Sequence, residues 1–360
     1  MKKGLLYFLI LILSLSFLTG CTKDKYKKYE DSFFDTFDTV TQIIGYAKSE
    51  DEFEVYMDKI HSRFLVLHKL FDKYKTYEGI NNIKTINDNA GIKPVKVEKE
   101  IIDLIIFSKE WYYKVGKETN IAMGPVINIW SKYRDKAIEN PKNAKIPPME
   151  ELKEASKHTD IEKVIVDKEK GTVFLEDANM SLDVGAVAKG YAVELVAREI
   201  EKEGLGSVLI SGGGNIKAIG KPMEKTKEKW GIGIQNPDKD LIDTGSILET
   251  LFVKDYSVVS SGDYQRYFIV DGEVYHHIID PDTLMPGDYY RAITIVTPDS
   301  GVADFLSTSA FLLPLEESKK LIESIDDTEA FWVMNDGKIE TTKGMEKIML
   351  SKGATGGKGK

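Results

Sequence analysis

Apolar residues recur at helical intervals in the first half of the chain. From Phe53 to Phe71 they follow one another at spacings of four and three residues, which is the stripe of an amphipathic helix that packs on a core. After the break at Pro94, a second apolar series predicts another helix over residues 101–115. The prolines between residues 135 and 150 predict a long surface loop.

Short β-branched runs dominate after residue 163. Residues 163–167 and 172–175 flank a Lys-Glu-Lys-Gly turn and predict a β-hairpin. Two helices interrupt the later strands, one over residues 187–200 and one over residues 303–313. This mixture predicts an α+β fold. Further strands are predicted at residues 208–211, 230–235, 257–260, 267–271, 274–278, 292–297 and 330–335.

The N-terminus carries a targeting signal. Lys2 and Lys3 precede an apolar stretch, residues 4–18, that is too short to span a bilayer but typical of a signal peptide. It runs into Leu-Thr-Gly-Cys, and Cys21 is the only cysteine of the chain. We therefore expect residues 1–20 to be a lipoprotein signal peptide and Cys21 to carry the lipid, which would hold the protein on the extracytoplasmic face of a bacterial membrane. The alternative is an ordinary cleaved signal beside an incidental cysteine.

Composition divides the mature chain into three parts. Residues 21–30 are charged and lack an apolar period, so they predict a solvated tether. Residues 31–350 form the folded domain, and the Gly/Lys-rich residues 351–360 predict a disordered tail. Without residues 1–20 the chain has 47 basic and 58 acidic residues, a formal charge of −11, which argues against nucleic acid as a partner.

Two glycine-containing segments could approach a ligand. Residues 183–190, Asp-Val-Gly-Ala-Val-Ala-Lys-Gly, lead into a predicted helix, whose free amides and positive dipole end suit an anion. They lack the residue order of a P-loop. Residues 211–215 contain three successive glycines after a predicted strand, which let the backbone approach a ligand or another strand. Purely local structure explains either segment equally well.

Polar side chains on the predicted helix 303–313 suit a hard cation. Asp304 and Thr308 stand four residues apart, so their oxygens project from the same face. With a carbonyl oxygen from elsewhere they would suit Mg²⁺. The alternative is a carboxylate that satisfies free amides at a helix start, with a core threonine behind it.

Two adjacent histidines end a predicted strand. Alternation places His276 and His277 on opposite faces, so at most one points into a given site. Their spacing fits no zinc site, and a hydrogen-bonded structural histidine is the alternative. Asp263 lies in a Ser-Gly-Asp-Tyr turn between two predicted strands.

In this order and spacing, the segments above resemble the ApbE family of flavin transferases, which move FMN from FAD onto a threonine of a target protein. The resemblance implies a T-fold-like α+β architecture, FAD as the substrate and Mg²⁺ as the cofactor. It implies an acceptor protein with a threonine, of the extracytoplasmic electron-transfer flavoprotein kind. Hydrolysis of FAD to FMN and AMP, or FAD binding without chemistry, would be alternatives at the same site.

The resemblance also assigns roles to single residues. It implies that Asp304, Thr308 and the backbone carbonyl of Ala186 bind Mg²⁺. His277 matches a histidine near the scissile phosphate, so His277 or Asp263 would accept the hydroxyl proton or orient the acceptor. The positions that match flavin contacts are Tyr74, Thr119, Asn120, Asp183, Lys189 and His277.

This chain departs from the family pattern in two places. Residues 37–39 read Phe-Asp-Thr where the family often has Met-Gly-Thr. Residues 120–125 read Asn-Ile-Ala-Met-Gly-Pro in place of Asp-x-Thr-x-Gly-Pro. Both departures concern recognition of the adenine and ribose rather than the metal centre.

Overall fold

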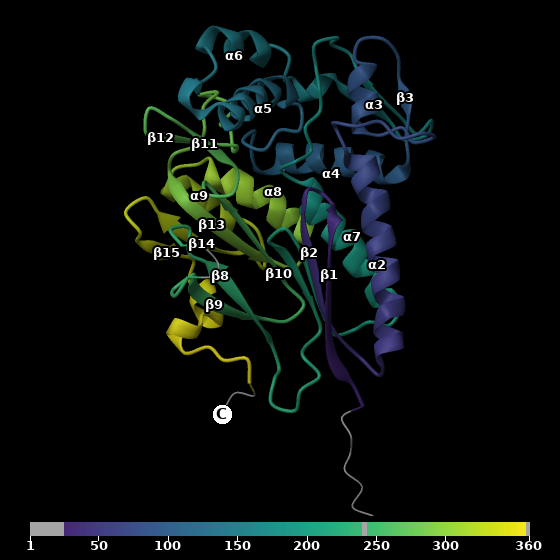
Figure 1. The fold of residues 1–360 in the computed structure, drawn as a ribbon, viewed down its shortest axis with the longest axis vertical. Helices are drawn as coiled ribbons and strands as arrows, with labels where there is room; N and C mark the ends of the chain where they lie inside the picture. Colours follow the sequence, from purple (N-terminus) through teal and green to yellow (C-terminus); the bar gives the residue numbers. More distant parts are fainter. Residues whose placement is uncertain (1–24, 240–242, 358–360) are drawn as a thin grey trace, which may run out of the picture.

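A computed structural model of the protein describes residues 25–239 and 243–357. The predicted signal peptide and Cys21 lie outside these residues. None of the helices in the described part is both long and apolar enough to cross a membrane. Helices and antiparallel strands mix along the chain, which confirms the predicted α+β class (Figure 1).

The centre of the fold is an eight-stranded sheet in the order β1-β2-β6-β7-β10-β13-β14-β15. All of its neighbouring strands pair antiparallel. Among the described residues, β1 and β15 are therefore the edge strands of this sheet. The strands are β1 (Lys27–Thr36), β2 (Thr39–Ala47), β6 (Val208–Gly212), β7 (Asn215–Ile219), β10 (Ser257–Gly262), β13 (Tyr290–Thr297), β14 (Glu329–Met334) and β15 (Ile339–Thr341).

Each face of this sheet has its own cover. Helices α2 (Glu50–Phe71), α7 (Ala188–Lys202), α8 (Ser300–Phe311) and α9 (Leu315–Glu323) pack on one face. The hairpin of β8 (Trp230–Gln235) and β9 (Ile247–Val253) packs on the other. Alternation along the strands supplies both cores, because Val258 joins the cluster under the β8–β9 hairpin and Val259 joins the cluster under α8.

Helix α2 follows the predicted apolar stripe. Phe53, Phe64 and Phe71 are all buried on its inner face, and the helix begins where the Ser49 side chain accepts a hydrogen bond from the Glu52 N–H. The second predicted helix is α4 (Lys99–Val115). Both helix predictions are therefore confirmed.

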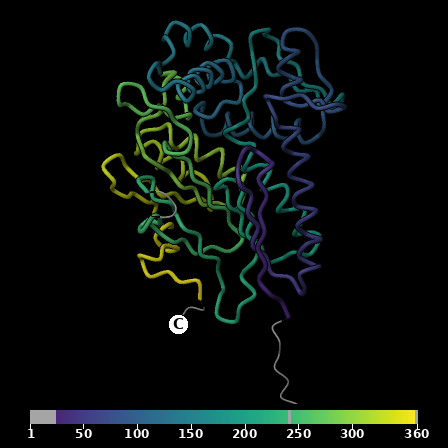
Figure 2. Tube along the Cα trace, viewed as in Figure 1, coloured from purple at the N-terminus to yellow at the C-terminus, as the bar shows by residue number. Residues whose placement is uncertain are grey.

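Most of the remaining elements form the upper part of the molecule in Figures 1 and 2. Trp130 of α5 stacks on Tyr275 of the β11–β12 hairpin, with ring centroids 6.0 Å apart. This contact joins the upper helices to the segment that carries the two adjacent histidines. The elements are α3 (Ile83–Asp88), α5 (Gly124–Glu139), α6 (Met149–Ser156), the small sheet β3 (Val95–Lys96), β5 (Thr172–Leu175) and β4 (Val164–Asp167), and the hairpin β11 (Tyr267–Val270) and β12 (Glu273–His276).

The prediction of a surface loop over residues 135–150 is wrong at both ends. Helix α5 continues to Glu139, and α6 begins at Met149. Pro141 starts a short 3₁₀ turn and Pro148 is the residue before α6. The prolines thus stand at helix starts, where a missing N–H breaks no hydrogen bond, rather than marking an irregular segment.

Two predicted boundaries also need correction. The tether of residues 21–30 is too long, because Lys27 already pairs with Ala47 in the β1–β2 ladder. The prediction of a disordered tail over residues 351–360 is wrong for residues 351–357. Gly356 accepts hydrogen bonds at its carbonyl from the N–H groups of Glu228 and Lys229, which ties this segment to the start of β8.

Candidate active site

The turn predicted to approach an anion leads directly into helix α7. Gly185 N–H donates to Asp183 Oδ1 at 2.9 Å, and Val187 N–H donates to the Val184 carbonyl at 3.0 Å. Val187 is the residue before α7 and offers no polar side chain to the helix amides. The Val184 carbonyl accepts the N–H of Ala188 at 2.8 Å, and the amides that follow can take an acceptor from another element.

That acceptor is Asp304 of α8. Its Oδ2 accepts the N–H of Gly190 at 2.8 Å, and its side chain is only 5% exposed. Gly190 is the third residue of α7, so Asp304 occupies the place of an N-cap side chain for a helix other than its own. The start of α8 itself is capped by Asp299, whose Oδ1 accepts the N–H of Val302 at 3.0 Å. The alternative interpretation, a carboxylate that satisfies free amides at a helix start, is therefore met at the first turn of α7 and not at that of α8, and the metal role of Asp304 stays a prediction.

The charge on Asp304 is only partly compensated. Burial raises the pKa of its carboxyl group, and Lys189, with Nζ 3.8 Å from Oδ1, opposes that rise. The side chain of Lys189 is 28% exposed and lines a narrow crevice with Thr41 and Gly212. A buried carboxylate with one distant cation is an environment in which a bound metal ion would be stabilised.

The other two predicted metal donors lie near Gly190 and Asp304 along the chain. Ala186 lies two residues before α7, and Thr308 lies one turn after Asp304 on α8. Together the three positions offer a carboxylate, a hydroxyl and a carbonyl oxygen, the donor set that suits Mg²⁺. Among the described residues, no group of three or more His, Cys, Asp and Glu side chains forms an alternative metal site.

The two histidines have different surroundings, as alternation predicts. His276 is held on both nitrogens, since Nε2 lies 2.6 Å from the Gly287 carbonyl and Nδ1 accepts the Ile278 N–H at 3.2 Å. His277 has a buried Nδ1 with no hydrogen-bond partner in the described part of the chain. Burial, together with the positive charges of Arg266 and Lys189 and the neighbouring His276, lowers the pKa of His277 to about 3. His277 is therefore neutral at pH 7, and its unpartnered Nδ1 can accept a hydrogen bond.

Asp263 is already engaged by a cation. Its Oδ2 accepts the Nε–H of Arg291 at 2.6 Å, and Arg291 also binds Asp238. Its other oxygen, Oδ1, is buried and finds no partner among the residues described. This ion pair makes Asp263 better suited to orienting an acceptor group than to taking up its proton.

Asp183 forms a buried ion pair with Lys73, a residue that sequence reasoning missed. Lys73 Nζ lies 2.5 Å from Asp183 Oδ2 and donates to Asn128 Oδ1 at 2.9 Å, and both charged side chains are at most one tenth exposed. Burial alone would raise the pKa of Asp183, but the charge of Lys73 lowers it overall. The carboxylate thus fixes the turn before α7 and ties it to the end of α2.

Three further predicted flavin positions differ in what they can still offer a ligand. Tyr74 is 60% exposed, and the ammonium of Lys73 lies 4.9 Å from its ring centroid. Thr119 is buried, with its hydroxyl 2.7 Å from Ser309 Oγ of α8. The side chain of Asn120 accepts the Ala122 N–H at Oδ1 and donates from Nδ2 to the Thr159 carbonyl. Tyr74 is therefore free to stack, whereas Thr119 and Asn120 could meet a ligand mainly through their backbone.

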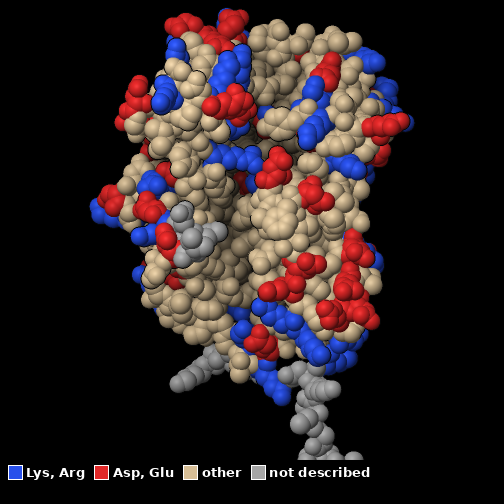
Figure 3. All heavy atoms as spheres, viewed as in Figure 1, with Lys and Arg blue, Asp and Glu red and all other residues tan. Residues whose placement is uncertain are grey.

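The surface beside these elements is hollowed. Figure 3 shows a hollow between the upper part of the molecule and the part that carries the large sheet, with basic and acidic side chains on its rim. The predicted site residues come from several elements, since Tyr74 follows α2, His277 follows β12, and Asp304 lies on α8.

Comparison with known proteins matches the chain to one family over most of its length. The ApbE family model covers residues 37–332. An FAD:protein FMN transferase from Treponema pallidum is 30% identical over 275 residues, which is 73% of this chain and 73% of that protein. One from Klebsiella pneumoniae is 29% identical over 74% of this chain and 81% of its own length.

Solved structures agree in fold. The ApbE protein of Thermotoga maritima superposes with a TM-score of 0.77 at 25% identity, over 89% of this chain and 99% of that one. The flavin transferase ApbE from Vibrio cholerae superposes with a TM-score of 0.73 at 19% identity, over 90% and 99% of the two chains. The chain described here belongs to the ApbE family.

Proposed function

We propose that this protein transfers the FMN moiety of FAD to a threonine hydroxyl of an acceptor protein in a Mg²⁺-dependent reaction. The observation that carries the proposal is the buried Asp304 carboxylate, held by the Gly190 N–H of another helix and facing Lys189. The relatives named FAD:protein FMN transferase support the substrate and the type of acceptor. Mg²⁺, when bound by Asp304, Thr308 and the Ala186 carbonyl, would offset the negative charge of the FAD pyrophosphate.

The residues of this chain account for the rest of the reaction. The acceptor Oγ forms a bond to the phosphorus of the FMN half, and the bond from that phosphorus to the AMP oxygen breaks. AMP leaves with the electron pair, and the hydroxyl proton passes to a base. His277 is placed for that task because its ring is neutral at pH 7 and its Nδ1 is unpartnered within the described chain. The negative charge of a bound pyrophosphate would raise the low pKa of this histidine toward the working pH and so make it a stronger base. Lys189 places a positive charge at the start of α7, beside Asp304.

Location forms a second part of the proposal. We infer that Cys21 carries a lipid and that the domain works outside the cytoplasm, attached to the membrane by a short segment that ends before β1 begins at Lys27. The acceptor would then be an extracytoplasmic electron-transfer flavoprotein. This part rests on the sequence of residues 1–21 alone.

The test is mass spectrometry of a candidate acceptor after incubation with the protein, FAD and Mg²⁺. We expect the acceptor to gain the mass of FMN less one water, with AMP released in equal amount. Free FMN together with AMP would identify a hydrolase instead, and unchanged FAD would identify a binding protein. The Asp304→Ala variant should lose the transfer while remaining folded. Equal turnover of this variant and the wild type at saturating Mg²⁺ would contradict the proposed metal site.

A further inference from the structure

Helices α7 and α8 meet through residues spaced four apart on each helix. On α7 the contact residues are Gly190 and Glu194, and on α8 they are Ser300 and Asp304. A spacing of four residues places each pair on one helix face. The two faces meet closely, since a Cβ atom on Gly190 would lie 2.3 Å from the Ser300 carbonyl oxygen.

The hydrogen bonds between these faces are reciprocal. Asp304 of α8 accepts the Gly190 N–H at the start of α7, at 2.8 Å. Glu194 of α7 accepts the Ser300 N–H at the start of α8, at 2.9 Å. Each helix therefore supplies a carboxylate to a free amide at the other's first turn, and the positive end of each helix dipole meets a negative charge.

Glu194 is the buried anchor of this arrangement. Its side chain is only 8% exposed, yet three groups satisfy its two oxygens. Oε2 accepts the Ser300 N–H and lies 3.1 Å from Lys217 Nζ, while Oε1 accepts the Nε–H of Arg198 at 2.7 Å. A buried carboxylate with this many partners holds one position, because each partner restricts it from a different direction.

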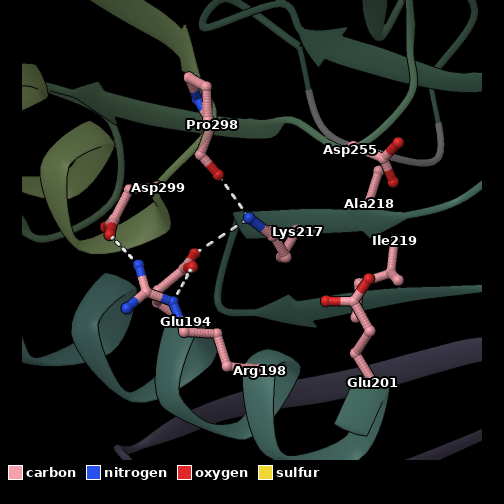
Figure 4. Close-up of a pocket in the computed structure, with 9 residues that line it drawn as sticks. All are labelled: Glu194, Arg198, Glu201, Lys217, Ala218, Ile219, Asp255, Pro298 and Asp299. Carbon is pink, nitrogen blue, oxygen red and sulfur yellow. Dashed lines mark hydrogen bonds and ion pairs between the residues drawn. The ribbon is translucent and has the colours of Figure 1, made fainter. Parts of the chain in front are cut away.

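The same network also holds the residue before α8. Arg198 donates to Asp299 Oδ2 at 2.7 Å, and Lys217 of β7 donates to the Pro298 carbonyl. Figure 4 shows these side chains around a pocket of about 250 Å³, with Glu194 between the two cations. The first turn of α8 is thus fixed from α7 and from β7 together.

We propose that Glu194 is a positioning residue for the metal centre, which sets the place of Asp304 by fixing the start of α8 against α7. The inference rests on the proposed Mg²⁺ role of Asp304. Asp304 is one helical turn beyond Ser300, and the predicted carbonyl donor Ala186 lies just before α7. Any slip of α8 along α7 therefore changes the distance between two donors of the same ion. Within the described chain, Glu194 makes its hydrogen bonds and ion pairs with Ser300, Lys217 and Arg198, and with none of the three proposed ligands.

The test is the affinity of the full-length protein, in detergent and with FAD present, for Mn²⁺ followed by electron paramagnetic resonance. In Glu194→Gln the side chain keeps its size but loses its charge and one acceptor oxygen. We expect the Mn²⁺ dissociation constant to rise about tenfold, the range seen when a group that supports a metal ligand is removed. Arg198→Gln, at a side chain that is 56% exposed, should fold readily and weaken Mn²⁺ binding in the same direction by less.

Glu199→Gln is the matched control. Glu199 lies on the same helix but pairs with Arg63 of α2, at 2.9 Å, and not with α8. We expect it to bind Mn²⁺ within twofold of the wild type, even if its melting temperature falls. The inference is overturned if Glu194→Gln and Arg198→Gln both bind Mn²⁺ as the wild type does while Asp304→Ala does not. If Asp304→Ala also binds as the wild type does, the proposed metal site itself fails, and the inference with it.

Discussion

The contact between α7 and α8 makes Gly190→Ala a sensitive test of the site. A Cβ atom at position 190 would lie 2.4 Å from Asp304 Cβ and 2.3 Å from the Ser300 carbonyl oxygen, closer than real Cβ contacts come. Neither atom belongs to the far end of a flexible side chain. Helix α8 must therefore move away from α7 by roughly 1 Å to restore ordinary contact distances.

The expected effect on stability is small, because two contributions oppose each other. Overpacking of a tight contact costs about 1–3 kcal/mol, while alanine is favoured over glycine inside a helix by about 1 kcal/mol. The free energy of unfolding should therefore fall by only about 1 kcal/mol. The effect on transfer should be much larger, since misplacing a catalytic group by about 1 Å can lower a rate by about 100-fold.

The assay pairs urea unfolding, followed by tryptophan fluorescence, with the single-turnover rate of acceptor flavinylation. Gly206→Ala is the control, because a Cβ atom there would meet nothing within 4 Å and the backbone is not in the left-handed region. We expect Gly206→Ala to match the wild type in both measurements. A Gly190→Ala variant that transfers FMN at the wild-type rate would refute the idea that the spacing of α7 and α8 sets the geometry of the site.

Three further predictions concern the anchor, the division of roles and the effect of pH. Cys21→Ser should move the protein from the membrane fraction to the soluble fraction, and continued tight membrane association would contradict lipid attachment. Lys189→Ala should mainly weaken FAD binding, measured by fluorescence quenching, whereas His277→Ala should bind FAD nearly normally and transfer FMN slowly. If His277→Ala binds FAD weakly but keeps its single-turnover rate at saturating FAD, then His277 does not handle the hydroxyl proton. Asp263 would then be the better candidate for that role. Folding lowers the pKa of His277 from 6.5 to about 3, so the unfolded chain binds a proton at this residue at a higher pH than the folded chain does. The contribution of His277 to the free energy of unfolding should therefore fall as the pH falls from about 6.5 to about 3. Urea unfolding between pH 4 and pH 7 should show a flatter decline in His277→Gln, and an unchanged slope would contradict the lowered pKa.

The sequence predicted best the elements whose burial is periodic. The stripe from Phe53 to Phe71 is one face of α2, and the hairpin of residues 163–167 and 172–175 pairs as β4 and β5, with Val164 opposite Leu175. Edge strand β1 was missed because most of its residues are exposed, so no alternation of apolar and polar positions marks it. Strand β2 was missed with it, as its partner in the ladder.

The glycines of residues 211–215 show why local pattern left two interpretations open. Gly213 and Gly214 both have positive φ, at 60° and 89°, and form the two-residue turn between β6 and β7. A Cβ atom on Gly213 would also lie 2.5 Å from Thr39 Oγ1, so the turn packs against the start of β2. Turn geometry and close packing by protein account for these two glycines, and a ligand is not needed to explain them.

The ion pair of Lys73 with Asp183 and the hydrogen bond of Gly190 to Asp304 could not be predicted, because each joins distant parts of the sequence. Lys73 meets Asp183 across 110 positions, and Gly190 meets Asp304 across 114. No local period marks Lys73, and a family motif names only the residues that touch the ligand. The supporting residues are found only after folding brings the elements together.

The arrangement of α7 and α8 explains why a single carboxylate can serve both the fold and the reaction. Without a polar residue at position 187, the first turn of α7 needs an acceptor, and Asp304 supplies it with Oδ2. A hydrogen bond from the backbone to one oxygen orients the carboxylate and leaves Oδ1 toward Lys189. The fold thus constrains the side chain that the proposed reaction needs in place before FAD arrives, which lowers the reorganisation required in the transition state. Changes at Gly190 or Glu194 should then affect transfer more than stability, because they alter where this carboxylate sits rather than whether the helices form.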